Sequence, residues 1–239
     1  MKLGIMQPYF FPYLGYFALI SKTDAWVVFD VSQYTPKSWM NRNRVLHPTE
    51  GWMYVTVPLQ GSSRNMAIHE ARVADRAGTH RSVLGKLSHY RKRAPHYVQV
   101  CNLVNQTFEG LIDDSLVHLN VNGLRAVCAY MGIPFSYQMA SEMEISIPPV
   151  THPGGWAPAI SRSLGADEYI NPIGGQALFD SAEFAASGVA LSYLDMPTWV
   201  YPTANFTFVP GLSILDVLMW NEPESVVNAM ESARVVKVA

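Results

Sequence analysis

Short apolar segments alternate along the chain with segments whose apolar residues recur at helical spacing. Residues 3–7 and 25–29 are continuous apolar runs rich in β-forming residues, and residues 13–21 between them have one apolar helical face. Two buried strands joined through a helix favour a right-handed parallel crossover. The chain therefore opens with a predicted strand, loop, helix and strand.

The same alternation continues through the rest of the chain. Further strands are predicted at residues 52–59, 67–73, 134–139, 168–171 and 189–193. Helices are predicted at 81–105 with a break at Pro95, then at 116–131, 157–164, 179–187 and finally 211–220. No repeat or linker interrupts the series, so one domain is expected over residues 1–239. The predicted class is α/β, with a largely parallel sheet flanked by helices and a helical C-terminal half.

Composition and charge narrow the range of partners. The chain is 49% hydrophobic and 15% charged with a formal net charge of −2, so it has no basic excess that would suggest DNA binding. No apolar run reaches the roughly 18 residues of a membrane span, and prolines interrupt the apolar N-terminus where a secretory signal needs a continuous run. The two cysteines and the histidines have no metal-ligand spacing. We expect a soluble, cytoplasmic protein without a metal site or a DNA partner; its oligomeric state stays open.

Aromatic and turn-forming residues crowd the loop after the first predicted strand. Ligands of open parallel sheets bind beyond the carboxyl ends of the strands, and this loop leaves such an end. Amphipathic rings there suit a small molecule or a sugar, although packing beneath a proline loop is an equally direct interpretation. The candidate ligand contacts are Gln7, Tyr9, Tyr13 and Tyr16.

A second group of polar residues follows the second predicted strand and should face the same crevice. Asp30 can orient an amine or act as a general base if its surroundings raise its pKa, or it can simply cap the strand. Gln33 can bind a carboxylate or an amide through both polar atoms, and Tyr34 lies beside it.

The motif "NRNR" is the strongest polar signal in the chain. If the segment is extended, Asn41 and Asn43 face one way while Arg42 and Arg44 face the other, as a clamp for a carboxylate or phosphate. At a helix start the donors would instead converge on an anion. Two surface arginines flanking a turn are the structural alternative.

The motif "NPIGG" ends another predicted strand. Gly174 and Gly175 permit positive φ or a close approach of the backbone to a ligand, and a plain tight turn explains them as well. The spacing is not that of a dinucleotide-binding fingerprint.

Several motifs resemble one known family over nearly the whole chain. The segments "MQPYFFPYLGYFALI", "WVVFDVSQY", "SWMNRNRV", "VPLQGSS", "LGADEYIN" and "FVPGLSILDVL" are similar to those of the WbqC-like family. Members occur among bacterial O-antigen and other surface-polysaccharide clusters, and a glycine or aminoacyl transferase role has been proposed for them. The opening also resembles the nucleotidylyltransferase-like group, pantothenate synthetases in particular, except that Tyr13 and Tyr16 stand where that group has two histidines.

These resemblances imply a function. We expect amide-forming transfer of an aminoacyl or acyl group to an amine of a small-molecule or sugar acceptor, with ATP or an activated donor such as aminoacyl-tRNA. Arg42 and Arg44 would hold an anionic group and Asp30 would handle the amine proton. The alternatives are a non-catalytic ligand-binding accessory protein and a nucleotidylyl- or adenylyltransferase.

Overall fold

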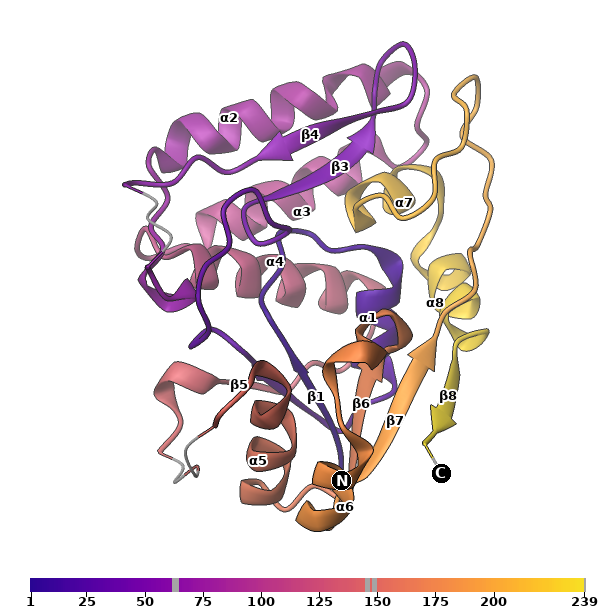
Figure 1. Cartoon of the computed structure of the whole chain (residues 1–239). Helices are drawn as coiled ribbons and strands as arrows, with labels where there is room; N and C mark the ends of the chain where they lie inside the picture. The colour runs from indigo at the N-terminus through magenta and orange to yellow at the C-terminus, as the bar shows by residue number, and fades with distance from the viewer. Residues whose placement is uncertain (62–64, 145–146, 148–149, 239) are drawn as a thin grey trace.

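A six-stranded sheet forms the centre of the computed structural model, which describes residues 1–61, 65–144, 147 and 150–238. The strand order is β5-β2-β1-β6-β7-β8; the first five are parallel and β8 is antiparallel at the edge (Figure 1). In chain order this is 3-2-1-4-5-6, a doubly wound arrangement. The predicted α/β class with a largely parallel sheet is therefore confirmed. The strands are β1 (Lys2–Met6), β2 (Ala25–Val28), β5 (Tyr137–Met139), β6 (Glu168–Pro172), β7 (Ala190–Asp195) and β8 (Arg234–Lys237).

Helices cover both faces of this sheet, which explains the continuous apolar runs. On one face Leu3 packs with Ile160 and Phe184, which come from α5 (Trp156–Ser163) and α6 (Ser181–Ser187). On the other face Trp26 packs in the larger core, to which α1 (Leu14–Ser21) contributes. β1 and β2 are joined through α1, as the sequence predicts.

A large insertion separates β2 from β5 and forms a second layer, seen at the top of Figure 1. It begins with the antiparallel hairpin of β3 (Arg42–Leu46) and β4 (Trp52–Thr56). Three helices follow it: α2 (Arg76–Leu87), α3 (Tyr97–Glu109) and α4 (Leu116–Met131). The break at Pro95 is confirmed, and Gly132 ends α4 in the left-handed conformation.

Two sequence predictions differ from the structure, and a third needs a qualification. The strand predicted at residues 52–59 is present as β4, but it pairs with β3 in a separate hairpin and not with the central sheet. Residues 67–73 form no strand, because a 3₁₀ turn at Ile68–Glu70 occupies their centre. The helix α7 (Ile214–Trp220) is not the final element, since α8 (Pro223–Glu231) and β8 follow it.

Buried polar side chains fix the aromatic loop between β1 and α1. Asn43 Nδ2 donates to the carbonyl oxygens of Phe10 and Phe11 at 3.1 and 2.8 Å, and Ser213 Oγ donates to Phe11 O at 2.7 Å. Phe11 has a φ of +40°, which is uncommon for a residue other than glycine. Because Phe10 and Phe11 are themselves buried, this loop is anchored at both its backbone and its side chains.

Candidate functional site

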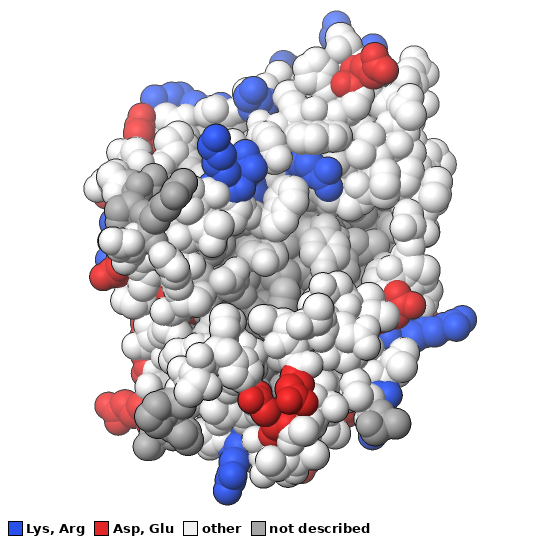
Figure 2. Space-filling view, viewed as in Figure 1, with Lys and Arg blue, Asp and Glu red and all other residues white. Residues whose placement is uncertain are grey.

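A cavity of about 930 Å³ opens beyond the carboxyl ends of β1, β2 and β6. β1 and β6 are neighbours in the sheet, and the chain winds away from them in opposite directions. This is the topological switch point, where doubly wound proteins bind their ligands. Figure 2 shows the hollow in the middle of the face turned to the viewer. The volume suits a small molecule or a cofactor.

The cavity walls are aromatic and uncharged. Within the described part of the chain, no Lys, Arg, Asp or Glu lines it. Burial raises the pKa of the phenols of Tyr9 and Tyr13, so both stay neutral and act as hydrogen-bonding groups. The ring-bearing walls are Tyr9, Tyr13, Phe29, Trp39, Trp156, Tyr169 and Phe179.

A few side-chain amides and hydroxyls give the cavity its polarity. Gln7, just after β1, donates from Nε2 to Ser32 Oγ at 3.0 Å. Asn171 in β6 donates from Nδ2 to the phenol of Tyr169 at 2.7 Å. A Cβ on Gly175 would lie only 2.4 Å from Asn171 Oδ1. A side chain at residue 175 would therefore require the Asn171 side chain to move.

One acid–base pair reaches the cavity through its histidine, since His152 lines the cavity and Glu183 does not. His152 precedes α5 and Glu183 lies in α6, and His152 Nε2 is 2.7 Å from Glu183 Oε1. A carboxylate that accepts from one ring nitrogen fixes the tautomer, leaving Nδ1 as the proton acceptor of the neutral ring. A histidine in this arrangement can accept a proton from a ligand that reaches Nδ1.

Six of the residues suggested by the sequence come together at this cavity. They come from the end of β1, the segment after β2 and the turn after β6, which are far apart in the chain. They are Gln7, Tyr9, Tyr13, Gln33, Gly174 and Gly175.

Other predicted site residues lie behind the walls. Tyr16 is fully buried, and its phenol donates to the carbonyl of Gln7 at 2.9 Å. Tyr34 is buried in the large core. Asn41 and Asn43 use their amides on backbone carbonyls, those of Val57 and of the aromatic loop respectively. These residues support the site from outside the lining.

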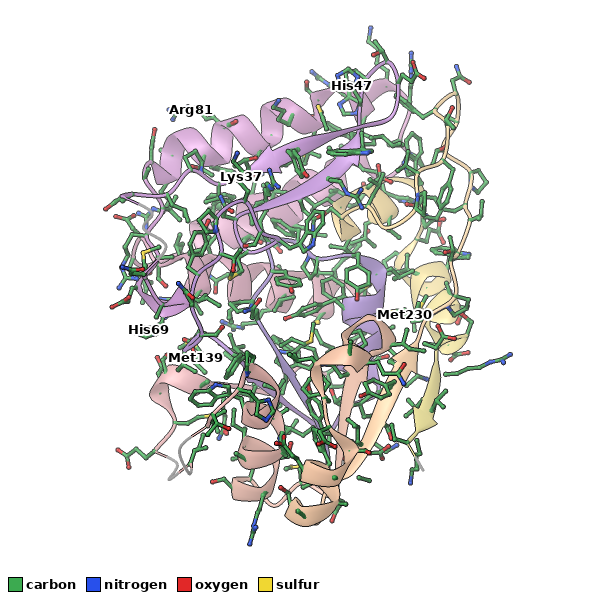
Figure 3. The ribbon with its side chains drawn as sticks, in the orientation of Figure 1. Lys37, His47, His69, Arg81, Met139 and Met230 are labelled. Atoms are coloured by element: carbon green, nitrogen blue, oxygen red, sulfur yellow. The ribbon has the colours of Figure 1, made fainter. Side chains whose placement is uncertain are left out.

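Asp30 is enclosed at the end of β2. Its carboxylate accepts hydrogen bonds from the backbone N–H and the hydroxyl of Ser141, and its side chain has no exposed surface. Its carbonyl accepts from the backbone N–H of His69 at 2.9 Å. Ser141 follows Met139, the last residue of β5; Met139 and His69 are both labelled in Figure 3. Asp30 thus joins β2 to two neighbouring segments and does not line the cavity.

The "NRNR" motif is extended, as one of the two interpretations predicted. Asn43 is buried while Arg42 and Arg44 are half-exposed on the opposite side of β3. Neither arginine lines the cavity. Arg44 reaches it indirectly, because its guanidinium stacks on Trp39, which does line it.

Sequence reasoning missed several residues of the site. His152 and Trp156 line the cavity without belonging to any quoted motif, and Trp39 lines it from the motif "SWMNRNRV" without being a predicted contact. The run Pro153-Gly154-Gly155 after His152 marks a turn at the start of a helix, which is a signal for the element but not for the pairing with Glu183. Only the packing of α5 against α6 brings the two side chains together.

In the described residues, no group of three or more His, Cys, Asp or Glu side chains is placed to hold a metal ion. None of the helices described is long and apolar enough to cross a bilayer.

The fold and the cavity define a doubly wound α/β protein with a ligand-sized site at its switch point. A model of the WbqC-like protein family matches residues 7–228, so the chain belongs to that family. A protein of Mycobacterium tuberculosis (strain ATCC 25618 / H37Rv), described as "Uncharacterized protein Rv1507c", is 26% identical over 221 residues, which span 91% of this chain and 92% of that protein. No solved structure matches at a significant level.

Proposed function

We propose that the chain transfers an acyl or aminoacyl group to an amine of a small-molecule or sugar acceptor bound in the switch-point cavity. The observation that carries the proposal is His152, which lines an uncharged cavity and is paired through Nε2 with Glu183 behind that lining. A histidine oriented by a carboxylate accepts protons in acyl transfer on unrelated folds. The family resemblance adds surface-polysaccharide biosynthesis in the cytoplasm as the setting.

The chemistry needs one proton acceptor and an activated donor. The acceptor amine attacks the carbonyl carbon of an acyl or aminoacyl ester, the new C–N bond forms and the ester C–O bond breaks. The amine proton passes to Nδ1 of His152 and then to the departing oxygen. Here His152 takes the proton-handling role that the sequence suggested for Asp30, because Asp30 is enclosed by Ser141. An aminoacyl-tRNA ester, or an acyl phosphate made with ATP, has the required reactivity.

Labelled amide formation tests this proposal. Purified chain is incubated with isotope-labelled aminoacyl esters and a panel of amino sugars and simple amines, and labelled amide is measured. His152→Gln should lower the rate roughly 10²- to 10⁴-fold, the usual contribution of a general base. Glu183→Gln should lower it less, because the imidazole remains.

A matched control comes from the chain itself. His118 pairs with Asp113 at 2.8 Å, which repeats the His–carboxylate chemistry away from the cavity. His118→Gln should leave the rate unchanged. The proposal is wrong if the wild type forms no labelled amide across the panel, or if His152→Gln keeps the wild-type rate with an unchanged melting temperature.

The cavity also favours a second candidate, a non-catalytic protein that holds a pathway intermediate. Its aromatic walls can bind a ligand without catalysing a reaction on it. In that case a ligand at one hundred times its Kd would stabilise the fold by about 2.7 kcal/mol and would be recovered unchanged.

A further inference from the structure

The outer face of the β3–β4 hairpin holds two guanidiniums against aromatic rings. Arg44 Cζ lies 5.2 Å from the ring centroid of Trp39 and 5.1 Å from that of Trp52. Arg42 Cζ lies 3.9 Å from the ring centroid of Tyr54. We call these five residues the arginine ledge. Stacking on ring faces fixes both cations in position.

The charges of the ledge are not compensated. In the part of the chain that the structure describes, the ion pairs are Met1–Asp167, His118–Asp113 and His152–Glu183, and none includes Arg42 or Arg44. Arg44 donates one hydrogen bond, from a terminal nitrogen to Gly211 O at 3.2 Å. The Nε atoms of both arginines are buried without a partner among the described residues. Most of the donor capacity of a guanidinium is therefore unused here.

Trp39 connects the ledge to the cavity. One residue thus lines the uncharged cavity and also stacks with the Arg44 guanidinium. Figure 2 shows Lys and Arg side chains on the surface directly above the hollow, and Figure 3 places Lys37 in the same region. A ligand that contacts both areas would need an uncharged ring for the aromatic walls and an anionic group for the ledge.

We propose that the ledge binds the phosphate of an organic phosphate whose uncharged ring occupies the cavity, which means a nucleoside phosphate or a sugar phosphate. Two unpaired positive charges match a phosphate group near charge −2 better than a carboxylate of charge −1. Residues two apart on a strand are separated by about 6.6 Å, so both guanidiniums can reach one phosphate or the two phosphates of a diphosphate. This inference rests on the proposed function in taking the cavity as the acceptor site, and it names the acceptor class.

Calorimetric titration tests the proposal without requiring turnover. The probes are UDP against uridine, and glucose 1-phosphate against glucose, with inorganic phosphate alone as a fifth probe. We expect at least one phosphorylated probe to bind more than 10-fold more tightly than its phosphate-free partner. The pair that shows the preference tells whether the cavity takes the base or the sugar.

Variants then assign the phosphate to the ledge. Arg44→Gln should reduce that preference about 10- to 150-fold, the range for a lost charge-assisted hydrogen bond, while affinity for the phosphate-free partner holds. For Arg42→Lys and Arg44→Lys, the preference should lie between those of the wild type and Arg44→Gln, because lysine keeps the charge but not the planar fork. Arg234→Gln, on the exposed edge strand β8, is the control and should change nothing. If Arg44→Gln does not fold, the two lysine variants carry the test.

Three results would overturn the inference. They are the absence of binding by every phosphorylated probe, equal binding within both probe pairs, and an equal loss in Arg44→Gln and Arg234→Gln. The outcomes also separate the two proposals. If the chain forms an amide from a phosphate-free acceptor but binds neither UDP nor glucose 1-phosphate, the phosphate-binding role of the ledge is wrong and the proposed reaction stands. If the chain binds phosphorylated probes selectively but forms no amide, the proposed reaction is wrong and the phosphate-binding role of the ledge stands.

Discussion

Asn43 belongs to the motif that suggested an anion site, yet its amide points inward and holds the carbonyls of Phe10 and Phe11. The sequence correctly separates the asparagines from the arginines, because alternation along a strand puts neighbours on opposite faces. It does not reveal which face is covered. Burial of the Asn43 face depends on the aromatic loop, which is more than 30 residues away in the chain.

This position makes Asn43 a stability residue. Asn43→Ala removes two buried hydrogen bonds to the loop and a third that the Arg44 N–H donates to Oδ1, and it leaves the Phe10 carbonyl without this donor, so the free energy of unfolding should fall by about 2–3 kcal/mol. Asn41→Ala, which removes one half-buried bond to Val57 O, should cost about 0.5–1.5 kcal/mol. Urea unfolding of the two variants measures the difference. Equal losses would mean that the loop is not held by Asn43.

Asp216 is the second residue whose role is settled by burial. Its carboxylate accepts from the phenols of Tyr90 and Tyr201 and has no exposed surface. Burial raises its pKa above the ordinary value in spite of these hydrogen bonds. The residue therefore anchors α7 within the core.

The raised pKa predicts a pH dependence of stability. The folded chain holds this proton more tightly than the unfolded chain, so Asp216 contributes most below the unfolded pKa of about 3.9. That contribution is lost as the pH rises through the folded pKa. The stability of wild type relative to Asp216→Asn, from urea unfolding between about pH 4 and 7, should therefore decrease with rising pH. A difference that grows with pH would show that the folded state favours the carboxylate.

At the scale of elements, most of the parallel sheet and its helices could be predicted from periodicity. The segments that could not are those whose pattern is ambiguous without tertiary partners. The sequence predicts an extended conformation for the NRNR segment of β3 as one of two possibilities. It does not predict that β3 pairs with β4, because cross-strand pairing is not visible in either segment alone. β8 has four exposed residues at the edge of the sheet, so it lacks the apolar alternation that marks a strand. Pro223 at the start of α8 stands at a position where proline favours a helix start.

Contact between β1 and β2 gives a prediction about a glycine. A Cβ on Gly4 would lie 2.5 Å from the ring of Trp26, so Gly4→Ala should overpack the sheet and destabilise the fold by about 1–3 kcal/mol. Gly85 lies on the exposed side of α2 with no atom within 4 Å of its added Cβ. Gly85→Ala should therefore stabilise the fold by about 0.5–1 kcal/mol. Thermal unfolding of both variants checks the pair, and a neutral Gly4→Ala would contradict the packing.

At the scale of the whole molecule, the sequence predicts where in the fold the site lies, but it predicts only some of the residues that line it. The predicted parallel order put the ends of β1 and β2 at one crevice, and Gln7, Tyr9 and Gln33 do line it. His152 and Trp156 come from a turn and helix start more than 100 residues later, and no pattern along the chain connects them to β1. Their place follows from the doubly wound order, which sets β6 beside β1.

A crystal structure with a bound acceptor tests the central claim most directly. The crystals would be soaked with the amine that gives the highest rate of labelled amide formation. The account predicts that its amine lies within about 3 Å of His152 Nδ1, as hydrogen bonding requires, and that its ring packs between Tyr9 and Trp156. An acceptor bound elsewhere, for example in the smaller cavity of about 320 Å³ lined by Trp199 and Phe208, would contradict the assignment of the switch-point cavity as the active site.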